Sequence, residues 1–293
     1  MKRVAYLTGR AWRKQPMAPG ALPWIEGDDF KLVSKAALAQ GVALDVRYWD
    51  DAHLPEAGFD AAIVRSTWDY IERCDEFLET LAAHQRNGLP IYNRPEVIAW
   101  NARKTYLQDL GALAIPTLWA DKLDAHEVAR AFDALDAAEL VIKPQIGGGS
   151  RETIRLKRNA WSEADLRDGP QSAAMLQPFL RSIETEGEHS LFWFGGQFAH
   201  AIRKAPRSGW FANDPNATDF IEETPPAAAR EVAEAARALA PKDLLYVRID
   251  VVQSDDGGWR VIEIEAIEPY LFLVFALAAA EVFAGAIARV LEG

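Results

Sequence analysis

The stretch YVRIDVVQSDDGGWRVIEIEAIE, residues 246–268, decides which fold we expect for this chain. Two runs of alternating apolar and polar residues flank a DDGG turn, which is the sequence form of a β-hairpin. In the first run, Val247, Ile249 and Val251 point to one face of the strand. Arg248 and Asp250 point to the other face, because successive side chains alternate across a strand.

The second run repeats this pattern, with Ile262 and Ile264 alternating with Glu263 and Glu265. If the strands pair through the turn, Asp250, Glu263 and Glu265 share one face. Three carboxylates on short strands can hold a divalent cation. The alternative is an amphipathic hairpin whose acidic face is solvated, and the rest of the chain has to distinguish the two.

Length and composition narrow the classes of function. A chain of 293 residues can form two or three packed units, and its formal net charge of −11 argues against nucleic-acid or anionic-membrane partners. The single Cys74 cannot form an intrachain disulfide, and the N-terminus lacks an apolar signal core, so we expect a cytoplasmic protein. The apolar stretch 270–290 has Glu281 near its middle and predicts a buried C-terminal helix that follows Pro269.

Residues 1–95 predict a small, mostly parallel α/β domain. Expected strands at 2–9, 43–49 and 59–66 alternate with expected helices at 28–40 and 75–87. Ligands of such sheets collect at the carboxyl ends of the strands. The candidate substrate-binding residues on these loops are Arg10, Arg65, Ser66, Thr67, Trp68 and Asp69. The arginine and hydroxyls suit a carboxylate and the aspartate an amine, and a capped turn with a packed tryptophan is the alternative.

The segment 139–158, ELVIKPQIGGGSRETIRLKR, predicts a strand, a glycine-rich loop and a second strand. Lys143 precedes Gly147, Gly148 and Gly149, and Ser150 and Arg151 follow them. Consecutive glycines let backbone N–H groups converge on an anion, and the flanking cations suit phosphate oxygens. A flexible hairpin is the alternative. Phosphate binding is favoured because the flanking charge is positive in an acidic chain.

Four further segments matter for the site. Residues 94–110 predict a helix that carries Lys104, and residues 173–181 predict a strand that breaks at Pro178 and can serve as a hinge beside a flat base. A strand pair around residues 195–196 ends in the basic pair Arg203 and Lys204. Residues 206–223 are rich in turn formers and predict a surface loop near the site.

The order of these parts resembles that of the ATP-grasp superfamily, in particular its glutathione-synthetase-like branch. The most similar members form a small group that contains the cyclo-ligase of cycloserine biosynthesis, which closes O-ureido-D-serine into a ring. The strings that carry this resemblance are VRSTWDY (64–70), WNARKTYL (100–107), GSRETIRL (149–156), LQPFL (176–180), AIRKAP (201–206) and EIEAIEPYLFL (263–273). The resemblance implies a two-lobed α/β fold with an N-terminal α/β domain (1–95), a central lid (96–180) and a C-terminal antiparallel-sheet lobe (181–293).

The resemblance also implies a role for each matching residue. ATP and Mg²⁺, with two metal ions, are the implied cofactors, and Asp250, Glu263 and Glu265 match the metal ligands, although the family has Asn at the last position. Arg203 matches the basic residue on the γ-phosphate or acylphosphate, and Ser150 and Arg151 belong to the loop over the phosphates. The implied nucleotide-binding residues are Lys104, Lys143, Gly147, Gly148, Gly149, Gln177, Pro178, Phe179 and Leu180, with either Glu184 or Glu188 on the ribose.

The reaction implied by the family is ATP-dependent ligation of a carboxylate to an amine through an acylphosphate, with release of ADP. The expected substrate is a small amino-acid-like carboxylate, and ring closure of an O-ureido-serine type of compound is one form of it. Two alternatives stay open, namely ligation onto a peptide or protein terminus and an ATP-binding regulatory protein without turnover. The sequence also leaves open whether the chain is a monomer or a homo-oligomer.

Overall fold

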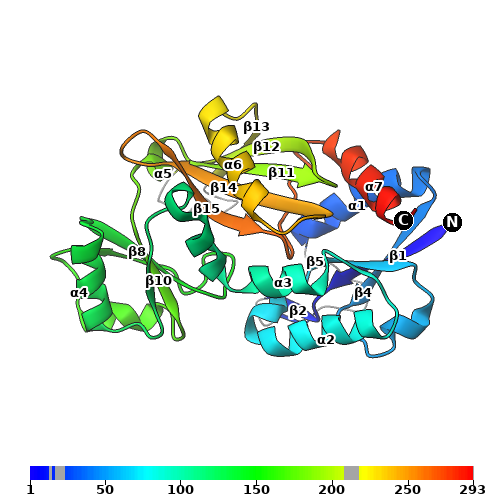
Figure 1. The fold of residues 1–293 in the computed structure, drawn as a ribbon, viewed down its shortest axis with the longest axis horizontal. Coiled ribbons are helices and arrows are strands. Elements are labelled where there is room, and N and C mark those ends of the chain that lie inside the picture. The colour runs from blue at the N-terminus through cyan, green and yellow to red at the C-terminus, as the bar shows by residue number, and fades with distance from the viewer. Residues whose placement is uncertain (13–14, 17–23, 208–217, 293) are drawn as a thin grey trace.

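The computed structural model describes residues 1–12, 15–16, 24–207 and 218–292, and it contains three main sheets (Figure 1). The first sheet is parallel and has the order β4-β1-β5-β6. Its strands are β1 (Lys2–Thr8), β4 (Val42–Tyr48), β5 (Ala61–Ser66) and β6 (Ile91–Tyr92). The parallel N-terminal α/β domain expected from the sequence is therefore confirmed.

Helices cover both faces of this first sheet. Helices α2 (Cys74–Arg86) and α3 (Pro95–Ala102) pack on one face through an apolar core that includes Leu7, Val64, Phe77 and Ile98. Helices α1 (Trp24–Ala39) and α7 (Ala279–Val290) lie on the other face. Short elements complete the domain: β2 (Ala11–Trp12), β3 (Gln15–Pro16), and the 3-10 helices η1 (Leu54–Ala57) and η2 (Trp68–Glu72).

The second sheet is antiparallel and forms the lobe at the left of Figure 1. Its order is β7-β10-β8-β9, with β7 (Leu118–Ala120), β8 (Glu139–Pro144), β9 (Ile154–Lys157) and β10 (Ala174–Pro178). Helix α4 (Ala125–Ala134) buries Val128 and Phe132 against this sheet, and its N-terminus is capped by the Asp124 side chain, which accepts from the Glu127 N–H. The 3-10 helix η4 (Glu163–Asp168) lies on the return to β10.

The third sheet, also antiparallel, carries the hairpin from which the fold was predicted. Its order is β13-β12-β11-β14-β15, with β11 (Glu188–Phe194), β12 (Gln197–Pro206), β13 (Thr218–Glu222), β14 (Tyr246–Gln253) and β15 (Trp259–Glu265). The short helix α5 (Ser182–Thr185) leads into it. Helix α6 (Ala227–Leu239) and the 3-10 helix η3 (Lys104–Leu113) bury apolar side chains against one face of this sheet. Since η3 packs here, we propose that the lid unit begins after η3 and not at residue 96.

The hairpin contains a bulge that the sequence pattern did not indicate. Asp250 pairs with Glu263 but Val251 pairs with Val261, so β15 has one extra residue at Ile262. The extra residue turns Ile262 onto the carboxylate face, where it packs with Val252 and Ile115. The prediction that Ile262 faces the opposite, apolar side is therefore wrong.

Three other expectations about local structure need correction. The C-terminal helix begins at Ala279, since the backbone of Phe272 has a φ of +55°, which an α-helix cannot contain. Residues 94–110 do not form one helix, since extended backbone at Arg103 (φ −111°, ψ 122°) separates α3 from η3. Within the expected loop 206–223, residues 218–222 form strand β13, and residues 208–217 lie outside the described part.

The 270–290 stretch raised the question of a membrane span. Among the helices of the described residues, none has both the length and the apolar character needed to cross a bilayer.

The N-terminal domain and the third sheet share one continuous core. The cluster joins Tyr6 and Ile63 of the first sheet to Phe192 and Tyr246 of the third sheet, with Phe283 of α7 between them. Burial of this much apolar surface fixes the two units relative to each other. The carboxyl ends of β1 and β5 are therefore held beside the hairpin.

The Asn93 side chain makes the polar contacts between the N-terminal domain and the third sheet. Its amide donates to the carbonyl oxygens of Tyr246 (2.9 Å) and Ala266 (2.7 Å), and its Oδ1 accepts from the Leu245 N–H (2.7 Å). The side chain is 1% exposed, so it compensates three buried backbone groups at once.

We expect Asn93→Ala to lower the free energy of unfolding by about 3 kcal/mol or more, because three buried backbone groups lose their partner. Urea unfolding followed by circular dichroism measures this change. Asn87→Ala, at an exposed position after α2, is the matched control and should change the free energy by less than about 0.5 kcal/mol. Equal effects of the two substitutions would contradict the assigned role of Asn93.

Candidate active site

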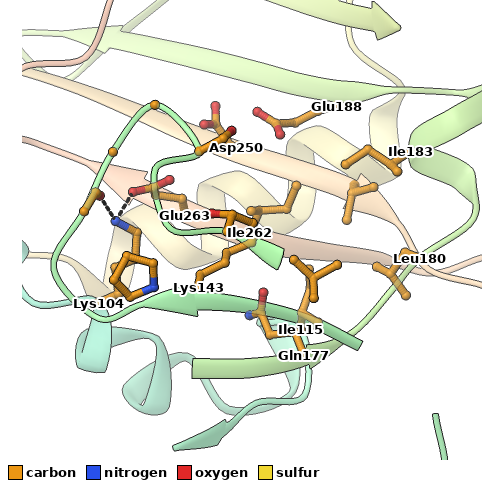
Figure 2. A pocket seen from close by; sticks show the side chains of 18 of the residues that line it. Lys104, Ile115, Lys143, Gln177, Leu180, Ile183, Glu188, Asp250, Ile262 and Glu263 are labelled. Carbon is orange, nitrogen blue, oxygen red and sulfur yellow. Dashed lines mark hydrogen bonds and ion pairs between the residues drawn. The ribbon is translucent and has the colours of Figure 1, made fainter. Parts of the chain in front are cut away.

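Three carboxylates of the β14–β15 hairpin converge in the structure. Ligand oxygens of Asp250, Glu263 and Glu265 all lie within 4.8 Å of one another. The sequence predicted this grouping from alternation alone, and in the structure all three line a pocket between the second and third sheets. Figure 2 shows Asp250 and Glu263 at one end of it. Carboxylate oxygens at such spacing are the donor set that Mg²⁺ prefers.

Two buried cations balance part of this negative charge. The Arg248 guanidinium contacts Asp250 Oδ2 at 2.8 Å and Glu265 Oε1 at 2.7 Å. The Lys204 ammonium contacts Asp250 Oδ2 at 3.5 Å and also bonds to Glu188. The Ser190 hydroxyl adds a hydrogen bond to Asp250 Oδ1 at 2.6 Å.

The pKa values reflect how this charge is distributed. Burial acts to raise the pKa of Asp250, but Arg248 and Lys204 hold it low, at about 2. Burial raises the pKa of Glu265 to about 8; Arg248 opposes this rise, and the neighbouring Glu263 carboxylate adds to it. A divalent cation bound among these carboxylates would add positive charge, and it would lower the raised pKa of Glu265.

Lys104 connects the carboxylates to the glycine-rich loop. Its ammonium lies 2.9 Å from Glu263 Oε1 and also donates to the Gly147 carbonyl oxygen (Figure 2). Burial works against the charged form of Lys104, but Glu263 raises its pKa above the ordinary value. Lys143, on β8, lines the same pocket, and burial lowers its pKa although Glu263 opposes the effect.

The glycine-rich loop closes over the pocket. Gly147, Gly148, Gly149, Ser150 and Arg151 all line it. Gly149 has a φ of +60°, and a Cβ added at Gly147 would lie 2.7 Å from the Pro144 ring, so both positions favour glycine. The Arg151 guanidinium contacts Glu72 of η2 at 2.8 Å, so the loop reaches the N-terminal domain.

The far end of the pocket is apolar and adjoins the predicted hinge. Figure 2 shows Gln177, Leu180, Ile115 and Ile183 at this end. The pocket lining also contains Pro178, Phe179, Val141, Val252 and Ile262. The Phe179 N–H is already bonded to the Glu139 carbonyl oxygen (2.9 Å), and the Arg155 guanidinium lies 3.4 Å from the centre of the Phe179 ring. A flat, apolar slot of this kind can accept a nucleobase.

The two glutamates that the sequence could not separate lie in different places. Glu188 lines the pocket beside Lys204, at the end that holds the carboxylates. Glu184 lies outside the pocket lining and contacts Arg155 at 2.7 Å, next to the Phe179 hinge.

The position of Arg203 corrects one sequence-based expectation. Neighbouring residues on a strand face opposite sides, and here Lys204 faces the carboxylates while Arg203 contacts Glu223 at 3.1 Å. Arg203 pairs across the ladder with His189, on the side of the sheet that α6 covers, and does not line the pocket. The basic residue that reaches the site from this strand is Lys204.

The predicted substrate-binding residues lie at the edge of the first sheet but make mostly structural contacts. Ser66 and Thr8 bond to each other, and Thr67 is buried. Asp69 accepts hydrogen bonds from the Trp49 indole (2.9 Å) and the Arg10 N–H (3.1 Å), while the Arg10 side chain contacts Asp50.

Two more of these residues hold the segment that follows the hairpin. Arg65 is fully buried and donates to the Pro269 carbonyl oxygen (2.6 Å), and the Trp68 indole donates to the Glu268 carbonyl oxygen (3.4 Å). Direct substrate contact by any of the six residues on these loops stays a prediction. What the structure shows is that Arg65 and Trp68 hold the backbone of Glu268 and Pro269.

The comparisons with known proteins agree with this geometry. Residues 49–268 match a family model described as "ATP-grasp domain, R2K clade family 3", and residues 4–93 match "D-cycloserine synthetase DcsG, N-terminal domain". The chain belongs to the ATP-grasp family. It is an ADP-forming ligase that makes C–N bonds.

Similar proteins cover nearly the whole of this ATP-grasp chain. The cycloserine biosynthesis protein DcsG of Streptomyces lavendulae is 31% identical over 289 residues, which is 90% of this chain and 94% of that protein. The crystal structure of D-cycloserine synthetase DcsG has a TM-score of 0.82 at 28% identity, with 99% of each chain covered. The ATP-grasp ligase PsnB, complexed with a precursor variant, Mg and ADP, has a TM-score of 0.63 at 16% identity, with 100% of this chain and 99% of that chain covered.

Sequence reasoning missed Arg248 and Lys204. Arg248 carried a usable signal, since it lies two residues before Asp250 and must share its face. For Lys204, the signal was the same alternation, but it needs the register of β12 against β11 before the inward residue of the pair can be chosen.

We expect Lys204→Met to weaken binding of ATP with Mg²⁺ by about tenfold or more, because a buried cation next to the site is lost. Arg203→Met should leave the affinity within about twofold of the wild type. Isothermal titration calorimetry of both variants measures the difference. A larger loss of affinity in Arg203→Met than in Lys204→Met would contradict this expectation and support the assignment of Arg203 to the γ-phosphate or acylphosphate.

Proposed function

We propose that this ligase activates the carboxylate of a small amino-acid-like substrate as an acylphosphate and then joins it to a nitrogen of the same molecule. A compound of the O-ureido-serine type is the first candidate. The full-length similarity to a cycloserine biosynthesis protein supports this substrate class. The supporting observation in the structure is the carboxylate trio with its buried cations at one end of an apolar pocket.

In this proposal, different groups of residues bind the base, the ribose and the phosphates of the nucleotide. The hinge and the apolar slot hold the base. We assign the ribose to Glu184, which contacts Arg155 next to Phe179. Lys104, Lys143 and the glycine-rich loop surround the phosphates. Asp250, Glu263 and Glu265 hold the metal site, and we propose that two Mg²⁺ ions bind there. The bound metal would neutralise phosphate charge and orient the γ-phosphate.

The chemistry needs little more than positioning and charge neutralisation. A substrate carboxylate attacks the γ-phosphorus, and ADP leaves. Arg248 sits beside the metal ligands and offers a fixed donor fork to the developing charge on the acyl group. Because the loop contacts the N-terminal domain through Arg151 and Glu72, water can be kept from the acylphosphate.

The bridge between the glycine-rich loop and the N-terminal domain favours a small substrate over a peptide terminus. The loop that lines the pocket is bridged to η2 of the N-terminal domain, and a peptide would need an open path at this point.

The proposal predicts ADP and phosphate release that depends on both Mg²⁺ and a ureido-amino acid. Purified protein with ATP is screened against O-ureido-D-serine, O-ureido-L-serine, the common amino acids and short peptides, with and without Mg²⁺. O-ureido-serine should stimulate ADP release at least about tenfold and yield a cyclised product by mass spectrometry. Stimulation by peptides alone, or ADP release that no compound changes, would contradict the proposal.

A further inference from the structure

We propose that Glu268 binds the attacking nitrogen of the substrate and takes its proton when the C–N bond forms. The inference rests on the proposed function, because it assigns a residue to the second half of that reaction. Sequence reasoning singled out Glu263 and Glu265 but gave Glu268 no role.

The backbone on both sides of Glu268 is held by three side-chain donors. The Tyr246 hydroxyl donates to the Ile267 carbonyl oxygen at 2.8 Å, and the Trp68 indole donates to that of Glu268 at 3.4 Å. The Arg65 guanidinium donates to the carbonyl oxygen of Pro269 at 2.6 Å. Arg65 lies on β5 and Trp68 begins η2, so the N-terminal domain helps to set the position of Glu268.

The Glu268 carboxylate is buried and without a protein partner. The residue is 9% exposed, and within the described part of the chain its carboxylate makes no hydrogen bond or ion pair. Its neighbours on the hairpin differ, since Glu263 contacts Lys104 and Glu265 contacts Arg248. A buried carboxylate without a partner destabilises the folded protein, and such groups commonly bind a ligand.

The position of Glu268 is on the acceptor side of the carboxylate trio. Glu263 and Glu265 line the nucleotide pocket, but Glu268 does not. The Trp68 indole of η2 bonds to the Glu268 carbonyl oxygen, so Glu268 lies next to the N-terminal domain. A nucleophile must approach the acyl carbon from a side that the nucleotide leaves free, and in the proposal this is the side that faces the N-terminal domain.

Glu268 is also distinct from the metal ligands. The set of carboxylates whose oxygens lie within 4.8 Å of one another contains Asp250, Glu263 and Glu265, and Glu268 is not in it. Burial raises the pKa of Glu268 to about 7, with Lys104 and Arg248 acting against the rise and Glu263 adding to it. A carboxylate in this environment can accept a proton near neutral pH.

The proposed step transfers the acyl group from phosphate to the substrate nitrogen. The lone pair of the substrate nitrogen forms a bond to the acyl carbon, and the bond between that carbon and the phosphate oxygen breaks. Inorganic phosphate leaves with the electron pair of the broken bond. The proton on the nitrogen passes to the Glu268 carboxylate and later to solvent.

Hydroxylamine separates this step from carboxylate activation. It is unprotonated at neutral pH and captures acylphosphates as hydroxamates without help from a base. We expect Glu268→Gln to form hydroxamate from O-ureido-serine and ATP at a rate within about threefold of the wild type. Formation of the cyclised product should fall at least about 100-fold, which is the range of general-base contributions. Glu231→Gln, the same change at an exposed position of α6, should alter neither rate.

Each outcome either supports or contradicts the role of Glu268 as the base. Loss of hydroxamate and product together, at an unchanged melting temperature, would place Glu268 in activation or metal binding and overturn the inference. Retention of both rates would overturn it as well. If the Gln variant melts at lower temperature, Glu268→Asp decides, since it keeps the carboxylate and should retain hydroxamate formation with part of the product. Absence of both products from the wild type would instead overturn the proposed function and the assignment with it.

Discussion

The structure of the site depends on the repulsion between three neighbouring carboxylates. Three carboxylates whose oxygens lie within 4.8 Å of one another cannot all ionise in a buried site unless cations lie among them. Arg248 and Lys204 supply part of that charge from strands of the same sheet, and Lys104 supplies more from the start of η3. Burial of the site raises the pKa of Glu265, and the neighbouring Glu263 carboxylate adds to the rise. A cluster of carboxylates of this kind has a physical reason to bind a divalent cation together with a polyphosphate.

The arrangement of the lobes follows from where these charges sit. The hairpin belongs to the third sheet, Lys143 and the glycine-rich loop belong to the second, and the N-terminal domain holds the backbone of Glu268 and Pro269. The shared core around Tyr246 and Phe283 fixes the first and third sheets relative to each other. The loop 147–151 then joins the second sheet to both, through Lys104 and through the Arg151–Glu72 pair. Chemistry between the sheets therefore depends on contacts that span all three.

Alternation and spacing were enough to predict the parallel N-terminal domain, the carboxylate hairpin and the glycine-rich loop, because each is a local pattern. The bulge at Ile262 could not be predicted, since it arises from pairing between two strands. The inward position of Lys204 beside the outward Arg203 likewise depends on register. The buried turns at Leu271–Leu273 look helical by composition, and only packing against the shared core shows otherwise. Arg65 also looked like a surface ligand, because the sequence cannot show that the hairpin's continuation covers it.

The central claim is that the carboxylate trio holds the metal of a metal–nucleotide complex. Diffraction from crystals grown with Mn²⁺ and a non-hydrolysable ATP analogue tests it directly, since Mn²⁺ is located by its anomalous signal. The account predicts anomalous peaks within coordination distance of Asp250, Glu263 and Glu265, next to the phosphates of the analogue. Nucleotide bound in the pocket with its metal away from these three residues would contradict it.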